Sequence, residues 1–222
     1  MTIVSIDFSI LYPGACICRD FNDFKWIAVV NSKVRKKDDD HFDLVNKNYP
    51  NLKILRTSTK RGKDEQYHVT ERIKLINYLD LIETFTQAIK EEIKNDQEVI
   101  FCLEGISFGS SGNSLVDIAQ STGILKHKII TQLLNYQHDR LFIFSPSELK
   151  NAIGCKGNAN KHDILAKFKT DPLIESVKNS DLFKLLQKED WVIEGDKILS
   201  PIIDMTDSYL GVVKVYQILK NN

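Results

Sequence analysis

Four carboxylates stand at positions where acidic side chains are unusual in a folded chain. Asp7 and Glu104 each follow directly after an apolar run that is typical of a buried strand. Asp204 and Asp207 are three residues apart in a segment with helical periodicity, so they share one face of that helix. A buried carboxylate is costly unless it is protonated, paired or bound to a cation. Hard divalent cations such as Mg²⁺ prefer oxygen ligands, so the four acids together predict a metal site.

Each of these acids also has a simpler explanation when it is taken alone. Asp7 is equally well explained as a turn or cap residue at the end of its strand. Asp204 and Asp207 lie near the start of their helix, where the helix dipole favours negative charge. The prediction of a metal site therefore depends on whether the elements that carry the acids bring them together.

Those elements predict a mixed sheet covered by helices. Three apolar runs near the start of the chain indicate antiparallel strands joined by short turns, and two further runs alternate with helices. The expected strands are 3–6, 15–18, 26–30, 99–103 and 141–144, and the expected helices are 70–94, 112–137 and those beginning at Pro146, Lys161 and Pro201. The chain is predicted to be one domain over 1–222, interrupted by two insertions.

The insertions lie near 31–68 and 171–199. The first is highly charged, contains KVRKKDDD and shows little apolar periodicity, which favours a long hairpin extension or a mobile loop. The second is expected to hold a helix around 182–186, followed by a hairpin across 194–196.

Five stretches of the sequence resemble the RuvC-type Holliday junction resolvases of the ribonuclease H-like superfamily. They are SIDFS, FCLEGISFG, SLVDIAQSTGI, SPSELKNAIGCKGNANKHDIL and DMTDSYLGVVKVY. The resemblance implies a ribonuclease H-like α/β fold with a mixed five-stranded sheet, three antiparallel strands followed by two parallel ones, flanked by helices. The two insertions depart from the bacterial pattern and resemble an elaborated viral or phage form.

The resemblance also implies a Mg²⁺-dependent, structure-selective endonuclease that cleaves branched DNA, four-way junctions above all. Two Mg²⁺ ions, with Mn²⁺ as an expected substitute, would be bound by Asp7, Glu104, Asp204 and Asp207, and Asp7 would bridge them. In such two-metal hydrolysis one ion activates the attacking water and the other stabilises the leaving 3′ oxygen. The alternatives are an RNA-acting nuclease of the same fold and a nucleic-acid-binding module without turnover.

Further residues match positions that the family keeps near the scissile phosphate. Lys161 is expected to stabilise developing negative charge as a catalytic residue, and Lys150 either does the same or only binds phosphate. Phe108 is expected either to stack on an unpaired base or to anchor its loop in the core. The expected DNA-binding residues are Phe108, Ser110, Ser111, Lys150, Lys156 and Lys161.

Composition sets limits on these expectations. Apolar residues make up 42% of the chain and charged residues 27%, as in an ordinary globular protein. The 30 basic and 30 acidic side chains cancel, so nucleic-acid binding requires local basic patches.

The sequence also predicts where the protein acts and how it assembles. The four cysteines form no C-x-x-C pair and are expected to be free thiols in a reducing cytosol. Without a signal-peptide pattern or a membrane span, the protein is expected in the cytoplasm, with the nucleoid or in a phage host. Cuts on two opposed strands predict a homodimer, with helices 70–94 and 112–137 at its interface.

Overall fold

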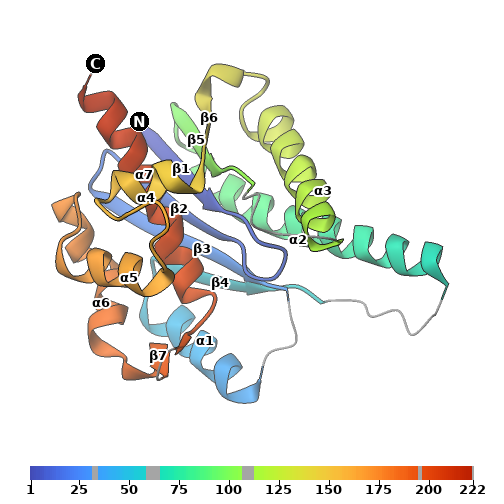
Figure 1. Ribbon diagram of the computed structural model, residues 1–222, viewed down its shortest axis with the longest axis horizontal. Coiled ribbons are helices and arrows are strands. Elements are labelled where there is room, and N and C mark those ends of the chain that lie inside the picture. Colours follow the sequence, from blue (N-terminus) through green and yellow to red (C-terminus); the bar gives the residue numbers. More distant parts are fainter. Residues whose placement is uncertain (32–34, 59–65, 107–112, 195–196, 222) are drawn as a thin grey trace.

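A six-stranded mixed sheet forms the centre of the molecule (Figure 1). The structure is a computed structural model that describes residues 1–31, 35–58, 66–106, 113–194 and 197–221. The strand order is β4-β3-β2-β1-β5-β6. β1 is antiparallel to β2 and β2 to β3, whereas β5, β6 and β4 pair in parallel with β1, β5 and β3 respectively. The strands are β1 (Thr2–Asp7), β2 (Gly14–Arg19), β3 (Asp23–Val30), β4 (Leu52–Arg56), β5 (Val99–Glu104) and β6 (Leu141–Phe144).

This arrangement confirms the mixed α/β fold class expected from the sequence, a sheet flanked by helices, with one correction. The expected number of five strands is wrong, because β4 adds a sixth strand beside β3. The three meandering strands and the two parallel strands that follow them lie as expected.

The sixth strand comes from the first insertion, which was expected to be a hairpin extension or a loop. Its described part instead forms helix α1 (Lys36–Asn48) followed by β4. Phe42 and Val45 of α1 are buried, as are Leu52 and Ile54 of β4. These few apolar side chains repeat at helical and then at strand spacing, but the many charged residues between them hide the pattern in the sequence.

Helices cover both faces of the sheet because the strand side chains alternate between the faces. Val4 and Ile6 pack toward the long helices α2 (Tyr67–Ile93) and α3 (Asn113–Lys128). Ile3 and Trp26 pack toward the opposite layer of helices. That layer contains α1, α4 (Pro146–Ala152), α5 (Lys161–Thr170), α6 (Asp181–Lys188) and α7 (Ile202–Lys220), as Figure 1 shows.

The remaining elements are short. The expected helix 112–137 ends earlier as an α-helix and continues as one turn of π-helix, Ile129–Leu133. Single 3₁₀ turns lie at His138–Arg140, Glu175–Asn179 and Asp190–Val192. In the second insertion, α6 and the antiparallel pair β7 (Ile193–Glu194) and β8 (Lys197–Ile198) match the expected helix and hairpin.

Helix α7 lies unusually close to the sheet, because two glycines remove the side chains that would hold it away. A Cβ atom on Gly14 would lie 2.6 Å from the carbonyl oxygen of Asp204. A Cβ atom on Gly211 would overlap the Oγ of Ser5 and the Sγ of Cys102. The first residues of α7 therefore lie against the start of β2, and the middle of the helix lies against the middle of β1 and β5.

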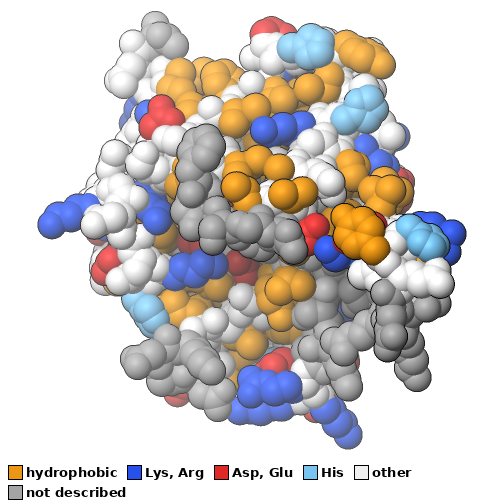
Figure 2. Space-filling model, turned by 45° about the vertical axis from the view of Figure 1, so that its right-hand side comes forward, with side chains coloured by type: hydrophobic (Ala, Val, Ile, Leu, Met, Phe, Trp, Pro, Cys, Tyr) orange, Lys and Arg blue, Asp and Glu red, His pale blue; other side chains and the backbone are white. Residues whose placement is uncertain are grey.

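The surface carries charges of both signs, in keeping with the zero net charge of the chain. On the face drawn in Figure 2, hydrophobic side chains gather over the upper half, and lysine and arginine side chains are dispersed with acidic ones elsewhere. Among the described helices, none combines the length and the apolar character that crossing a membrane requires.

Candidate active site

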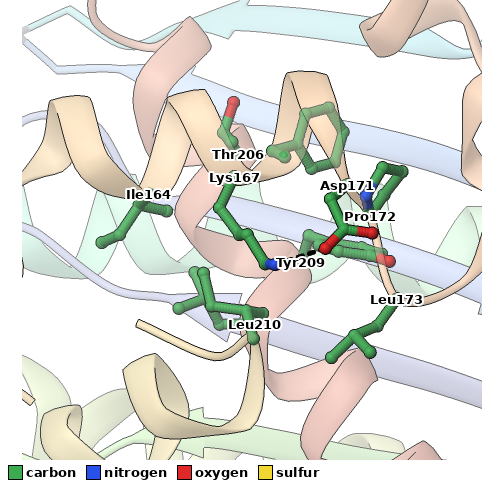
Figure 3. A pocket seen from close by; sticks show the side chains of 10 residues that line it. Ile164, Lys167, Asp171, Pro172, Leu173, Thr206, Tyr209 and Leu210 are labelled. Atoms are coloured by element: carbon green, nitrogen blue, oxygen red, sulfur yellow. Dashed lines mark hydrogen bonds and ion pairs between the residues drawn. The ribbon is translucent and has the colours of Figure 1, made fainter. Parts of the chain in front are cut away.

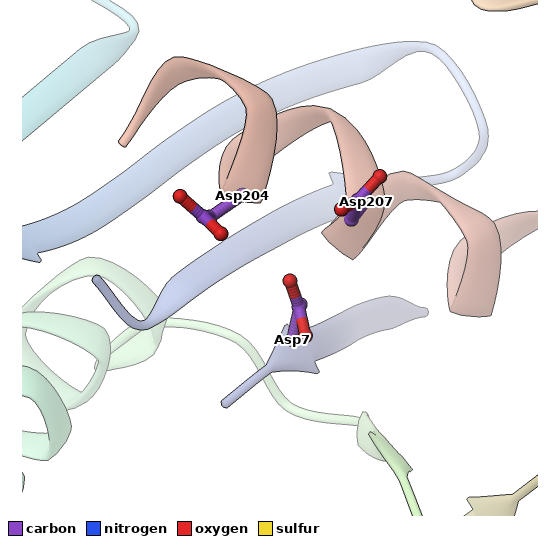
Figure 4. Close-up of side chains that lie close together, drawn as sticks. All are labelled: Asp7, Asp204 and Asp207. Atoms are coloured by element: carbon purple, nitrogen blue, oxygen red, sulfur yellow. The ribbon is translucent and has the colours of Figure 1, made fainter. Parts of the chain in front are cut away.

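Three of the predicted carboxylates meet where β1 ends beneath α7. One carboxylate oxygen from each of Asp7, Asp204 and Asp207 lies within 4.8 Å of the other two. Figure 4 shows Asp7 rising from β1 toward α7, on which Asp204 and Asp207 lie. Asp7 is far in the sequence from Asp204 and Asp207, so only the packing of α7 on the sheet brings the three together.

The fourth carboxylate borders the same site from the neighbouring strand. Ile6 of β1 is in register with Leu103 of β5, so Asp7 and Glu104 end adjacent parallel strands. Glu104 does not belong to the group of three within 4.8 Å, but it lines the same cleft. The structure thus brings all four predicted acids together where β1 and β5 end, and three of them lie within 4.8 Å of one another.

Lys161 supplies the positive charge nearest to these acids. Its Nζ lies 3.1 Å from Asp204 Oδ1 and 3.3 Å from Asp207 Oδ2. The side chain starts from the first residue of α5, and that helix is fixed by a capping box in which Asn160 and Asp163 accept each other's backbone N–H groups. The helix start therefore holds the ammonium group over the two aspartates of α7.

Burial and crowding shift the ionisation of the cluster. Burial raises the pKa of Asp7 well above its usual range, and the neighbouring charges of Asp207, Glu104 and Asp204 raise it further. Burial also raises the pKa of Asp207 to about 6, although Lys161 opposes this shift. For Lys161, burial alone lowers the pKa, but the surrounding carboxylates outweigh burial and leave the pKa above its usual value.

The residues present fit a bound cation. Among the described side chains, the buried Oδ2 of Asp204 and Oδ1 of Asp207 have no hydrogen-bond partner. An unpaired carboxylate oxygen in a buried position is costly. A divalent ion with oxygen ligands would satisfy these atoms and would lower the repulsion that raises the pKa of Asp7. The donor set consists of carboxylates, which suits Mg²⁺, Mn²⁺ or Ca²⁺.

The acids line a cleft of about 220 Å³ that also contains two lysines. Lys150, from α4, borders the cleft together with Lys161. The Nζ of Lys150 donates a hydrogen bond of 2.8 Å to the carbonyl oxygen of Ala159, just before α5. Lys150 therefore has a structural role in holding the segment that presents Lys161, in addition to its charge beside the cleft.

A second hollow of about 150 Å³ lies on the other side of Asp7 and Glu104. Its remaining lining residues are mostly apolar and come from the ends of β1 and β5 and from α3: Phe8, Gly105, Ile106, Ile118 and Thr122. Because both spaces share the two carboxylates, the site has a lysine-bearing side and an apolar side. We name these the lysine cleft and the apolar hollow.

Another depression, between α5 and α7, does not belong to this site (Figure 3). It has room for only about 10 Å³, which is at the limit for one water molecule. Lys167 and Asp171, which form an ion pair, both line it. This depression is too small for a substrate, and it is a packing defect beside Tyr209.

None of the other predicted DNA-binding residues is among the described residues that line the lysine cleft. Lys156 is exposed on the turn before α5 and is absent from the described lining of the lysine cleft. Phe108, Ser110 and Ser111 lie outside the residues that the structure describes.

Several residues that line the site were missed in the sequence. Ser9 borders the lysine cleft, and its spacing of two from Asp7 places it on the same side of an extended segment. Phe8, Ile118 and Thr122 border the apolar hollow, but their types are those of ordinary core residues. The alternation of side-chain directions along an extended segment could have indicated from the sequence that Ser9 lies near Asp7. No sequence signal separates Ile118 from its helical neighbours.

Fold and site together define a mixed α/β protein with a carboxylate cluster at the carboxyl ends of two central strands. Two solved structures are similar to it, a RuvC from Thermus thermophilus and the same protein in complex with a Holliday junction substrate. They share 11% and 10% identity with this chain, each over 98% of this chain and 96% of the other, with a TM-score of 0.48. No protein-family model and no curated protein matches the sequence.

Proposed function

We propose that this protein is a Mg²⁺-dependent endonuclease that cleaves branched DNA, with four-way junctions as its main substrate. The observation that carries the proposal is the convergence of Asp7, Asp204 and Asp207 within 4.8 Å, beside Glu104 and two lysines. Such a group of carboxylates destabilises the fold unless it binds cations, so a role in chemistry explains it better than a structural role. The RuvC-like motifs around these acids indicate the substrate.

Asp7, Asp204, Asp207 and Glu104 are the residues that would hold the metal. When bound, two divalent ions activate a water nucleophile and stabilise the leaving 3′ oxygen. Asp7 interacts with the charges of all three other acids and is therefore the residue that would be shared between the ions.

The lysines act on the substrate. The ammonium groups of Lys150 and Lys161 border the cleft in which the scissile phosphate would lie, and each stabilises negative charge on its oxygens. Lys161 also neutralises part of the acidic cluster before substrate binds, through its contacts with Asp204 and Asp207. Lys156, exposed nearby, would contact the backbone outside the cleft.

The functional unit we propose is a homodimer of 1–222 chains, each folded as one domain, because resolution of a junction requires two cuts on opposed strands. The protein would act where the DNA is, in the cytoplasm. An RNA-acting nuclease of the same fold remains the main competing assignment, since no reader of the 2′-hydroxyl is evident from the sequence.

Cleavage of a synthetic four-way junction tests the proposal, with duplex DNA and an RNA–DNA hybrid as competing substrates. Wild-type protein with Mg²⁺ should cut the junction, and Asp7→Asn should reduce cleavage to background while junction binding stays unchanged or tightens, because a negative charge is removed. Asp40→Asn, at an exposed position of α1, is the matched control and should cleave normally. Preferred cleavage of the hybrid, or Mg²⁺-dependent cleavage by Asp7→Asn, would contradict the assignment.

A further inference from the structure

The described lining of the apolar hollow contains no lysine, yet the hollow adjoins the carboxylates directly. Asp7 and Glu104 form a wall common to the hollow and to the lysine cleft. The rest of its described lining consists of the apolar side chains of Phe8, Ile106 and Ile118, the backbone at Gly105 and the side chain of Thr122. Figure 1 shows α3, which carries Ile118 and Thr122, beside the strands that end at the site.

We propose that the apolar hollow binds one unstacked nucleobase, that of a nucleotide adjoining the scissile phosphate. This inference rests on the proposed nuclease function and adds a base-binding subsite to it. A pocket lined mainly by apolar groups with a few polar atoms is typical of small-molecule subsites. A nucleobase has this character, since its faces are apolar and its edge carries hydrogen-bonding groups.

The position of the hollow identifies the occupant more closely. A phosphate held between the carboxylates and the lysines of the lysine cleft is covalently joined to a nucleoside on each side. Because the hollow begins at Asp7 and Glu104, one of these nucleosides has to lie over it. The lysine side therefore suits the anionic backbone and the apolar side suits the base attached to it.

The size of the hollow excludes a stacked base pair. At about 150 Å³ it is far smaller than the 300–1,000 Å³ of pockets for drug-sized ligands, so it admits a single ring system. Removing a base from a duplex costs a few kcal/mol, and the cost is lowest where the base is already unpaired. The subsite thus favours branch points, where the stack of bases is interrupted and a base is easier to remove, over regular duplex.

Base occupancy is measured with 2-aminopurine, whose fluorescence rises when it leaves the stack. The probe is placed in turn at each nucleotide near the cut of a four-way junction. Asp207→Asn serves as the non-cleaving background, because Asp207 does not line the hollow. This protein should raise the fluorescence severalfold at one position beside the cut and not at the others.

Two variants in the Asp207→Asn background assign the signal to the hollow. Ile118→Phe fills the space and should abolish the rise in fluorescence. Leu219→Phe adds the same ring at the end of α7, outside the hollow and outside α2 and α3, at a position that is 41% exposed, and should leave the signal intact. If both variants bind the junction and both retain the rise, the hollow is not the base site.

An abasic scan decides the question even if Ile118→Phe fails to fold. The wild-type protein is given junctions in which each nucleotide near the cut in turn lacks its base. Cleavage should fall roughly tenfold at one position, because base stacking on protein side chains contributes about 1–3 kcal/mol. Equal cleavage of all these junctions would overturn the base-binding subsite but leave the nuclease function standing. Failure of the wild type to cleave any junction would instead contradict the nuclease function.

Discussion

At the scale of single residues, the site concentrates negative charge in a place that water reaches poorly. The ammonium group of Lys161 forms ion pairs with Asp204 and Asp207. The buried Oδ2 of Asp204 and Oδ1 of Asp207 nevertheless have no hydrogen-bond partner among the described residues. The pKa of Asp207 is raised to about 6 despite the lysine beside it. The metal-free protein therefore carries a local electrostatic cost at neutral pH.

This cost predicts an unusual pH dependence of stability. Because the pKa of Asp207 is raised on folding, ionisation destabilises the folded state as pH rises from about 4 through 6. Without divalent ions, Asp207→Asn should have the same melting temperature as wild type at pH 4. At pH 7.5 it should be more stable by about 2 kcal/mol, or roughly 4–8 °C.

Calorimetry in EDTA measures this difference, and the exposed Asp80→Asn serves as control with no expected shift at either pH. Added Mg²⁺ should raise the melting temperature of the wild type more than that of Asp207→Asn. A lower melting temperature for Asp207→Asn at pH 7.5 would show that its pairing with Lys161 outweighs the repulsion.

At the scale of elements, the site depends on how closely α7 packs against the sheet. Gly211 permits contact with Ser5 and Cys102, and Gly14 permits contact with the backbone of Asp204. α5 makes the complementary contribution, since its capping box fixes the residue from which Lys161 extends. The starts of α5 and α7 and the end of β1 thus determine where Lys161 and the three aspartates lie.

Gly211→Ala tests this packing. The added methyl group would overlap Ser5 and Cys102, so α7 has to move, and stability should fall by about 1–3 kcal/mol. Affinity for Mg²⁺, measured by calorimetric titration, should fall as well, because Asp204 and Asp207 move away from Asp7.

Gly123→Ala is the matched control for this substitution. Gly123 lies in α3, and a Cβ atom there meets nothing within 4 Å, so helix propensity should stabilise the protein by about 0.5–1 kcal/mol. If Gly211→Ala proves as harmless as Gly123→Ala, close packing does not hold the acids in place.

At the scale of the whole molecule, the two insertions pack against each other at one end of the sheet. The hydroxyl of Tyr49 donates to Glu189 at 3.0 Å, and Trp191 donates to the same carboxylate at 2.9 Å. The ring of His41 stacks on Trp191 with centroids 4.2 Å apart. The insertions therefore enlarge the molecule on the β4 side, away from the exposed surfaces of α2 and α3.

Those surfaces are where we expect the second copy to bind. Leu75 and Leu79, one turn apart on α2, are 47% and 42% exposed, and Val116 of α3 is 54% exposed. Light scattering should give a mass of twice 25.5 kDa for the wild type and 25.5 kDa for Leu79→Glu. Leu219→Glu, 41% exposed at the end of α7, should remain a dimer. A monomeric wild type at all concentrations would contradict this interface.

The sequence by itself determined five of the six strands of the central sheet and the identity of its acids. Strands such as Val99–Glu104 are continuous apolar runs, so their burial is evident from residue type alone. The spacing of Asp204 and Asp207 and the capping residues at Ser145 and Asn160 are local features, and local features are visible in one dimension. β4 escaped prediction because its apolar residues Leu52, Ile54 and Leu55 form only a short run within a highly charged segment, and it becomes a strand through pairing with β3.

Only the tertiary structure decided the geometry of the site. Lys161 and Asp204 are 43 residues apart, and their ion pair exists because α5 and α7 pack together. The apolar hollow is formed by Phe8, Ile106 and Ile118 from three separate segments, and each of them resembles a core residue in the sequence. A cavity is a property of the space between elements, so no pattern along the chain predicts it.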